Sequence, residues 1–223
     1  MKQTEALSTK DRILDAAEQL FAERGFAATS LRTITAAAQV NLAAVNYHFH
    51  SKEALIRAVF ARRLDLVNQQ RLQLLEACQQ RAGKGPPPLE EVLEAFFGPA
   101  LRLGRGSAQS GINFQRLMGR MYAEPGEHFR SLLQEQFKEV AVRFRAALRR
   151  ALPELPSVEL YWRVHFMIGA MAHTLAGVDY LQFVSEGQCD PSDVEGTIHR
   201  MVVFLAAGLR APAGPRGTLR SRK

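Results

Sequence analysis

Four side chains near the N-terminus have the chemistry to bind a nucleic acid. Arg32, Tyr47, His48 and Lys52 fall within a stretch of twenty-one residues. A lysine, a tyrosine hydroxyl and a histidine N–H can each donate a hydrogen bond to a phosphate oxygen, and an arginine can donate two parallel bonds to one guanine. Arg32 can read a base in this way or only clamp a phosphate, and its residue type leaves both roles open.

The same stretch has no acidic residues. No Asp or Glu occurs between Glu23 and Glu53, and a carboxylate there would repel phosphates. The chain of 223 residues has 29 Lys and Arg against 22 Asp and Glu, a net charge of +7. This charge is +3 over residues 1–63, −1 over residues 64–209 and +5 over residues 210–223. The positive charge therefore lies at the two ends of the chain, and the N-terminal end also carries the candidate base contacts.

Helices must position these side chains. Apolar residues at 3.6-residue spacing predict a first helix that begins after Ser8 or Thr9 and ends at Gly25. Two short helices are expected next, and Ser51 then caps a long helix that runs to about residue 80. Two short helices joined by a tight turn form a helix-turn-helix, whose second helix enters the major groove of DNA. The short helices are predicted over about residues 31–37 and 42–48.

The helix-turn-helix defines a predicted DNA-binding surface. His48 has a second role open to it, packing against the first helix, and Asn41 can serve mainly as a helix cap. Asn46 can meet a phosphate or an adenine, whereas Ala43 and Ala44 can only contact a thymine methyl or permit close approach. The predicted DNA-binding residues are Thr29, Ser30, Arg32, Asn41, Leu42, Ala43, Ala44, Asn46, Tyr47, His48 and Lys52.

The rest of the chain is also helical in pattern. Residues 83–88 read Gly-Lys-Gly-Pro-Pro-Pro, which cannot be helical and marks a loop. No alternating strand pattern competes with the helical periods that follow. We therefore predict an all-α protein of about nine helices. The later helices are expected over about residues 89–103, 110–123, 127–152, 158–185 and 191–209.

These elements divide into three predicted parts. Residues 1–50 would form a helix-turn-helix DNA-binding domain, and residues 51–209 a larger helical domain for ligand binding and dimerisation. Residues 210–223 combine Pro, Gly and Ser with five positive charges and few apolar groups. Such a composition predicts a flexible basic tail.

Several motifs of the N-terminal part resemble those of a known family. Residues 12–26 read Arg-Ile-Leu-Asp-Ala-Ala-Glu-Gln-Leu-Phe-Ala-Glu-Arg-Gly-Phe, residues 29–32 Thr-Ser-Leu-Arg, residues 45–49 Val-Asn-Tyr-His-Phe, and residues 51–55 Ser-Lys-Glu-Ala-Leu. Together they resemble the N-terminal domain of TetR-family transcriptional regulators. Residues 40–49 further resemble the fatty-acid-responsive PsrA-like subgroup of that family.

The resemblance implies roles for individual residues. Lys52 resembles a lysine that contacts phosphate at the start of its helix, and Arg32 matches a position that often reaches a base edge. Ala43 and Ala44 replace the glycine and threonine that are frequent there, and Gln39 replaces a frequent turn glycine. The base preference of other family members therefore cannot be carried over to this chain.

The resemblance also implies a two-fold dimer built from the last two helices. Small residues around Gly169 would let helices approach closely, and the apolar run over 202–208 is too continuous for an exposed helix. Two-fold symmetry predicts a palindromic DNA operator. The expected partners are thus double-stranded DNA, a second copy of the chain and a small ligand, with no membrane.

The nearly neutral middle of the chain has the pattern of an adaptable apolar site. Met and aromatic residues recur there at helical spacing, which suits a ligand pocket as well as an ordinary core. Arg116 and Arg120 lie beside Phe114 and Met118, and an arginine at an apolar cavity would bind the acidic head of a fatty acid or acyl thioester. The predicted ligand-binding residues are Phe114, Arg116, Leu117, Met118, Arg120, Met121, Tyr122, Phe137, Phe144, Trp162, His165, Phe166 and His173.

Other classes of function have little support in the sequence. Gly83-Lys84-Gly85 lacks the spacing of a phosphate loop, and no cluster of Cys or carboxylates accompanies His48 and His50, so we expect no enzyme, cofactor or metal site. The favoured function is a repressor that a ligand releases from DNA. A transcriptional activator and an architectural DNA-binding protein without a ligand are the alternatives.

The composition favours a cytoplasmic protein. Cys78 and Cys189 are the two cysteines and lie far apart, which argues against a disulfide scaffold. Charged residues near the N-terminus predict that no secretory signal is present. The longest apolar candidate, residues 167–178, is shorter than the ~20 residues that a membrane span requires.

Overall fold

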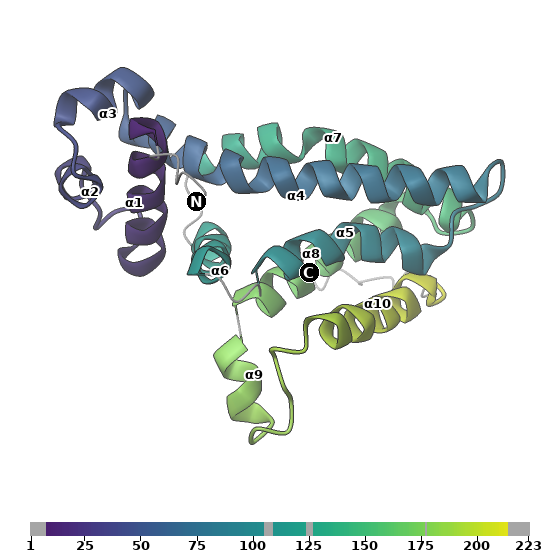
Figure 1. Cartoon of the computed structure of the whole chain (residues 1–223). Coiled ribbons are helices and arrows are strands. Elements are labelled where there is room, and N and C mark those ends of the chain that lie inside the picture. The colour runs from purple at the N-terminus through teal and green to yellow at the C-terminus, as the bar shows by residue number, and fades with distance from the viewer. Residues whose placement is uncertain (1–7, 105–108, 124–126, 177, 214–223) are drawn as a thin grey trace, which may run out of the picture.

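The chain folds into α-helices throughout the part that the structure describes (Figure 1). The computed structural model describes residues 8–104, 109–123, 127–176 and 178–213. The predicted all-α class is confirmed. The helices are α1 (Thr9–Arg24), α2 (Leu31–Ala38), α3 (Leu42–Phe49), α4 (Lys52–Ala82), α5 (Leu89–Gly104), α6 (Gln109–Ala123), α7 (Glu127–Ala151), α8 (Ser157–Ala176), α9 (Val178–Val184) and α10 (Val194–Arg210).

Polar side chains cap the starts of the first four helices. The side-chain oxygens of Ser8, Ser30, Asn41 and Ser51 each accept a hydrogen bond from the main-chain N–H three residues later, at 2.9–3.1 Å. Each bond satisfies an N–H group that the helix itself leaves without a partner. The caps that the sequence predicts at Asn41 and Ser51 are confirmed.

The helix-turn-helix and α4 share one apolar core. The ring centroid of Phe26, which follows α1, lies 5.4 Å from that of Phe21 in α1 and 5.9 Å from that of Phe60 in α4. Val45 of α3 is fully buried as well. The buried side chains continue from these residues into the C-terminal helices as one connected cluster. The predicted boundary at residue 50 therefore does not coincide with a break in the core.

The longest helix, α4, joins the two ends of the molecule. It packs against α1 and α3 near its start, and against α5 and α7 along the rest of its length (Figure 1). The helix α6 lies between α1 and α8, while α10 packs against α5. In Figure 1 the short helix α9 projects away from this body.

The described residues form ten helices where the sequence predicts about nine. The stretch expected as one helix over 158–185 is divided into α8 and α9, and Gly177 between them lies outside the described residues. Apolar residues continue on both sides of this division. Periodicity alone therefore did not reveal where α8 ends.

The boundaries of α10 also differ from the prediction. Asp193 is its cap and accepts a hydrogen bond from the N–H three residues later at 2.9 Å, so the helix begins at residue 194 and not near 191. Asp190 instead accepts an N–H two residues later at 2.8 Å, so its side chain closes a turn before the helix. Arg210, assigned to the tail, is the last residue of α10 and pairs with Glu90 of α5. The tail from residue 214 onward lies outside the described residues.

Two further observations concern membrane and metal sites. None of the described helices combines the length and the apolar character needed to cross a lipid bilayer. Within the same ranges, no three His, Cys, Asp or Glu side chains are grouped so that they could hold a metal ion. Cys78 is buried and Cys189 is exposed, and both are free thiols.

Candidate DNA-binding site

The predicted recognition residues lie together at the exposed end of the helix-turn-helix. On α3, Leu42 is 41% exposed and Tyr47 is 79% exposed, whereas Val45 is fully buried. Tyr47 is apolar over most of its surface, so burial in a monomer would be its usual state, and its exposure marks a contact surface. The other exposed members of the predicted set are Ser30, Arg32, Asn41, Ala43 and Asn46, and Ala44, His48 and Lys52 are partly exposed.

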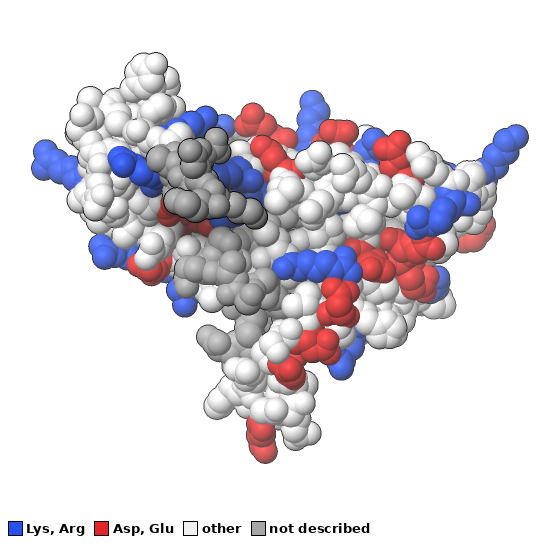
Figure 2. Space-filling model, in the orientation of Figure 1, with Lys and Arg blue, Asp and Glu red and all other residues white. Residues whose placement is uncertain are grey.

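This end of the molecule carries little charge. Figure 2 shows the surface over α2 and α3 as mostly white, with isolated Lys and Arg side chains around it. Arg32 is the only charged residue within α2 and α3. A recognition surface of this kind offers few charge-assisted contacts to bases, so shape and apolar contacts must contribute to its specificity.

Two adjacent aromatic rings stiffen the end of α3. The ring of His48 meets that of Tyr47 edge-on, with their centroids 5.1 Å apart. An edge-to-face pair of this kind restricts both side chains. The hydroxyl of Tyr47 is thereby presented to solvent, where it can donate to a phosphate oxygen.

The start of α4 adds an anion-binding element. Lys52 is the first residue of the helix, and Ser51 Oγ caps it by accepting from the N–H of Ala54 at 3.1 Å. A helix N-terminus carries partial positive charge, and its free N–H groups bind phosphate. Lys52 adds a full charge at this point, so a phosphate placed here would be attracted both by the helix N-terminus and by the lysine.

The turn between α2 and α3 has an unusual backbone. Gln39 has φ 54° and ψ 48°, the left-handed conformation that glycine adopts most easily. Its main-chain oxygen accepts a hydrogen bond from Arg12 Nη2 of α1 at 3.0 Å. This bond ties the turn to the first helix and holds α3 at its angle to α2.

Thr29 does not belong to this surface. Its side chain is fully buried, and its hydroxyl donates to the main-chain oxygen of Gly25 at 2.8 Å, with Leu20 O at 3.3 Å. The structure therefore contradicts the prediction that the Thr29 side chain faces DNA. The hydroxyl instead fastens the end of α1 to the start of α2. Its neighbour Ser30 is exposed and supplies the cap.

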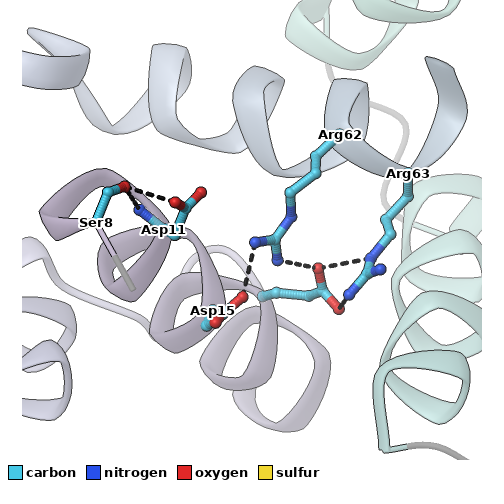
Figure 3. Close-up of polar contacts among 6 residues, drawn as sticks. Ser8, Asp11, Asp15, Arg62 and Arg63 are labelled. Atoms are coloured by element: carbon cyan, nitrogen blue, oxygen red, sulfur yellow. Dashed lines mark hydrogen bonds and ion pairs between the residues drawn. The ribbon is translucent and has the colours of Figure 1, made fainter. Parts of the chain in front are cut away.

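A buried carboxylate anchors α1 to α4. Glu18 is 2% exposed and accepts hydrogen bonds from two arginines of α4. Figure 3 shows these arginines, Arg62 and Arg63, reaching from α4 toward α1. Arg62 Nη2 donates to Glu18 at 2.6 Å, and Arg63 donates through Nε at 3.0 Å and through Nη2 at 2.9 Å. Arg62 also donates to Asp15 at 2.7 Å. Burial lowers the pKa of Arg62, but its hydrogen bonds to Glu18 and Asp15 outweigh this effect and raise that pKa above its ordinary value.

The sequence analysis did not predict this cluster of Glu18, Arg62 and Arg63, although the position of Glu18 gave a signal. Glu18 occupies the apolar face of α1, four residues after Leu14 and three before Phe21. An acid on such a face requires a buried cationic partner. The partner could not be identified from the sequence, because it lies more than forty residues further along the chain.

Arg120 ties α6 to the end of α1. Its Nη2 donates to the main-chain oxygen of Glu23 at 2.9 Å and its Nε to that of Ala22 at 3.2 Å. The last carbonyls of a helix carry partial negative charge, so a guanidinium there is stabilising. Arg120 was predicted to face a ligand. The structure shows it in contact with the last turn of α1 instead.

The other predicted ligand residues fall into two groups. One group is buried in the C-terminal helices, whereas the second lies along the exposed face of α8, where Trp162 is 57% exposed and Phe166 is 62% exposed. Arg116 is exposed on α6, and the side chain of Tyr122 lies outside the described residues. The buried group is Phe114, Leu117, Met118, Met121 and Phe144, with Phe137 half-buried, and the exposed group is Trp162, His165, Phe166 and His173.

Sequence reasoning also missed the most deeply buried cation of the C-terminal part. Arg71 of α4 is 1% exposed and donates to Asn68 Oδ1 at 3.1 Å. Both residues share the buried face of the helix with Leu64, Val67 and Leu75. The signal in the sequence was this spacing, because steps of three and four residues put Arg71 on the apolar face.

Comparison with protein families assigns both parts of the chain. Residues 13–59 match the family described as bacterial regulatory proteins, tetR family. Residues 94–208 match the tetracyclin repressor-like C-terminal domain. The two matches cover the helix-turn-helix and most of the helices behind it.

The similarity to individual curated proteins covers a short part of the chain. The chain is 44% identical over 57 residues to the HTH-type transcriptional regulator UidR of Escherichia coli K12, which is 26% of this chain and 29% of UidR. It is 55% identical over 47 residues to the HTH-type transcriptional repressor Rv3405c of Mycobacterium tuberculosis, which is 21% of this chain and 25% of that protein. The chain thus matches less than a third of the length of these relatives.

Solved structures share the fold over nearly the whole chain. FadR from Bacillus subtilis in complex with stearoyl-CoA has a TM-score of 0.62 at 15% identity, and covers 89% of this chain and 98% of its own. SmeT in complex with triclosan has a TM-score of 0.61 at 22% identity, and covers 93% of this chain and 96% of its own. With the two family matches and the exposed helix-turn-helix, the chain belongs to the TetR family of DNA-binding transcriptional regulators, whose members are not enzymes.

Proposed function

We propose that the protein is a homodimeric repressor that occupies a palindromic operator and leaves it when a small apolar ligand binds the C-terminal helices. The observation that carries this proposal is the double attachment of α1. Glu18 of α1 binds Arg62 and Arg63 of α4, and the last turn of α1 binds Arg120 of α6. A change in α4 or α6 therefore moves the helix on which the DNA-binding surface rests. A protein that acts on the chromosome in this way would work in the cytoplasm.

Exposed apolar side chains on α8 and α10 support the proposal that the protein forms a dimer. Trp162 and Phe166 of α8 are 57% and 62% exposed, and Phe204 of α10 is 72% exposed. Gly169 and Gly208 have open space where a side chain would begin, so helices of a second copy can approach closely. Large apolar side chains exposed on two helices that contact each other are typical of an interface. Two-fold pairing through it would set two helix-turn-helix units about 34–36 Å apart on adjacent turns of DNA.

The buried side chains of α6 and α7 support the proposal that the ligand is apolar. Phe114, Met118 and Phe144 are each at most 3% exposed, and methionine adapts readily to ligands of different shape. Two proteins that share this fold hold such molecules, stearoyl-CoA in FadR and triclosan in SmeT. The PsrA-like resemblance of residues 40–49 favours an acyl chain among these ligand types.

Operator selection from genomic DNA with the full-length protein tests the proposal. We expect a palindromic site bound by two copies of the chain, with a dissociation constant of roughly 10⁻⁸ M or tighter at physiological salt. Genes beside the site will indicate which apolar compounds to add. Binding should weaken when such a compound is present, and transcription from the site should rise when the gene for the protein is deleted.

Other outcomes would contradict parts of the proposal. A fall in transcription on deletion would identify an activator. Sequence-specific binding that no small molecule changes would favour an architectural protein. Equal affinity for selected and random DNA would overturn the proposed function as a whole.

A further inference from the structure

One hydrogen bond joins α1 to the turn that precedes α3. Arg12 Nη2 of α1 donates to the main-chain oxygen of Gln39 at 3.0 Å. The two residues are 27 positions apart in the sequence, so the bond is a tertiary contact and not part of a helix. Only Val40 and the cap Asn41 separate Gln39 from the first residue of α3. The bond therefore acts at the point where the direction of α3 is set.

Main-chain hydrogen bonds close the end of α2 around Gln39. Its N–H donates to the main-chain oxygen of Ala36 at 3.2 Å. The N–H of Val40 donates to the main-chain oxygen of Thr35 at 3.0 Å. This pair of bonds ends a helix through one residue in the left-handed conformation, which is usually glycine. Gln39 adopts it with φ 54° and ψ 48°, although a residue with a Cβ atom disfavours it. A return of Gln39 to an ordinary conformation would break this pattern and turn α3 away from its present direction.

Arg12 is also in an unfavourable local state at this contact. Its Nε is buried and has no hydrogen-bond partner within the part of the chain that the structure describes. A buried N–H group without an acceptor is destabilising, and so is the left-handed conformation of Gln39. Local strain of this kind is typical of functional sites, where the surrounding structure maintains it. The strained contact lies next to Asn41 and Leu42, two exposed members of the predicted DNA-binding set.

We infer that Arg12 is a positioning residue for DNA recognition, which sets the direction of α3 through the main-chain oxygen of Gln39. The bond favours the left-handed conformation, because this oxygen faces Arg12 in it. In that conformation α3 presents Asn46 and Tyr47 to the major groove at the angle that contacts with bases require. Arg12 acts through the protein main chain and does not itself touch DNA. The inference rests on the proposed function, because its test needs an operator.

A glycine at position 39 would make the bond from Arg12 unnecessary. Glycine adopts the left-handed conformation about as readily as any other, so the turn would keep its direction without Arg12. Alanine would not replace glycine here, because it retains the Cβ atom. The effect of losing Arg12 should therefore depend on which residue occupies position 39. The loss of a residue that contacts DNA directly would show no such dependence.

Binding of the full-length protein to its selected operator and to random DNA tests the inference. Arg12→Met should reduce the preference for the operator by roughly tenfold, about the effect of one lost base contact. The affinity for random DNA and its dependence on salt should stay the same, because no phosphate contact is lost. Gln39→Gly in the Arg12→Met background should restore the preference to within about twofold. Fluorescence anisotropy at several salt concentrations measures these affinities.

Three further variants serve as matched controls. Gln39→Ala in the Arg12→Met background should leave the operator preference low, because alanine gains none of the freedom of glycine. Gln39→Ala alone should keep the preference, since the main-chain oxygen that accepts from Arg12 remains. A loss of preference in this single variant would place the glutamine side chain on the DNA and overturn the inference. Arg24→Met should change neither affinity, because Arg24 is exposed at the opposite end of α1.

Other results would also overturn the inference. Equal losses on operator and random DNA for Arg12→Met, with a salt slope smaller by about one, would make Arg12 a phosphate contact. A loss that Gln39→Gly does not repair would show that Arg12 does not act through the turn. Circular dichroism checks that each variant is folded. If Arg12→Met alone does not fold, Gln39→Gly must restore both the fold and the operator preference, and its failure to do so would contradict the inference.

The outcomes separate the inference from the proposed function. An unaltered protein with no preferred operator would overturn the proposed function, and the inference with it. An operator preference that survives Arg12→Met would leave the proposed function intact and overturn the role of Arg12 alone.

Discussion

Arg120 of α6 donates a hydrogen bond from Nη2 to the main-chain oxygen of Glu23, the next-to-last residue of α1, at 2.9 Å. The bond joins a helix of the C-terminal part to a helix that packs against α2 and α3. A guanidinium at a helix C-terminus satisfies carbonyls that the helix leaves without partners and interacts favourably with its dipole. The contact therefore stabilises the end of α1 and attaches it to α6.

Replacement of Arg120 by methionine should loosen the end of α1. We expect a loss of about 1–2 kcal/mol in the free energy of unfolding, because two hydrogen bonds to carbonyls disappear. Hydrogen exchange of the amides at the end of α1 should become faster. Arg116→Met is the matched control, since Arg116 is exposed on the same helix and its loss should change stability by less than about 0.5 kcal/mol. Equal effects of both variants in urea unfolding would contradict this reading.

Neutralising Glu18 should destabilise the attachment of α1 to α4. Glu18→Gln leaves Arg62 and Arg63 facing a neutral amide at a buried position. We expect a loss of about 1–3 kcal/mol, the lower part of the range for broken buried pairs, because both arginines are partly exposed to solvent. Asp15→Asn, at the exposed side of the cluster, should cost less than about 1 kcal/mol. Urea unfolding at pH 7 measures both, and a Glu18→Gln variant as stable as the original protein would refute the prediction.

A glycine at the turn of the helix-turn-helix should be stabilising. Gln39 has φ 54°, which costs energy for any residue with a Cβ atom. Gln39→Gly should therefore raise the free energy of unfolding by about 0.5–1 kcal/mol, and the main-chain bond from Arg12 should persist. Ala37→Gly is the control, because Ala37 lies inside α2, where glycine should instead destabilise by about 0.5–1 kcal/mol. Thermal unfolding of the two variants should thus shift in opposite directions.

A charge on the exposed face of α10 should separate the proposed dimer. Phe204 is 72% exposed, so Phe204→Glu should leave the folded chain intact while opposing burial against a second copy. Analytical ultracentrifugation at micromolar concentration should show monomers, and operator affinity should fall at least tenfold. Val142→Glu, at a 51% exposed position on α7, should leave the dimer intact. A monomeric original protein, or a dimeric Phe204→Glu variant, would disprove this interface.

Arg32 and Lys52 should differ in what they contribute to DNA binding. Lys52→Ala should weaken binding to operator and random DNA alike and reduce the slope of log affinity against log salt by about one. Arg32→Ala should instead reduce the preference for the operator by about 1–3 kcal/mol if Arg32 reads a guanine. Titrations on both DNA types at several salt concentrations measure the two effects. Equal losses on both DNA types for Arg32→Ala would make it a phosphate clamp.

Local chemistry made much of the N-terminal part predictable. A cap such as Asn41 or Ser51 acts on an N–H three residues away, so its effect is contained in a few neighbouring residues. The left-handed conformation of Gln39 was harder to predict from the sequence. Glutamine does not favour that conformation, and the bond from Arg12 holds it in place. Contacts between distant segments, such as Glu18 with Arg63, had no local signal that could identify both partners.

Periodicity identified apolar faces of the C-terminal helices but not which of them is inside. On α8, Met167 and Met171 are buried, whereas Trp162 and Phe166 on the neighbouring face are exposed. A helix that is apolar on both faces requires two partners, and the sequence of one chain shows only that both faces exist. The predicted ligand residues of α8 therefore all lie on its exposed face, whereas most of those on α6 and α7 are buried. Placement against α6 decides which face is internal.

The helix α4 is long enough for a small tilt to cause a large displacement of its first residue. Its 31 residues make a rod of about 46 Å, at about 1.5 Å per residue. A tilt of roughly 4° about its far end would displace Lys52 by about 3 Å, close to the ~3.4 Å rise between successive base pairs of one strand. In the proposed repressor, a ligand would therefore not need to unfold or rotate a domain to disturb operator binding. An angular change too small to disrupt the packing of α4 against α5 and α7 would shift each half of the proposed dimer by about one base pair of register.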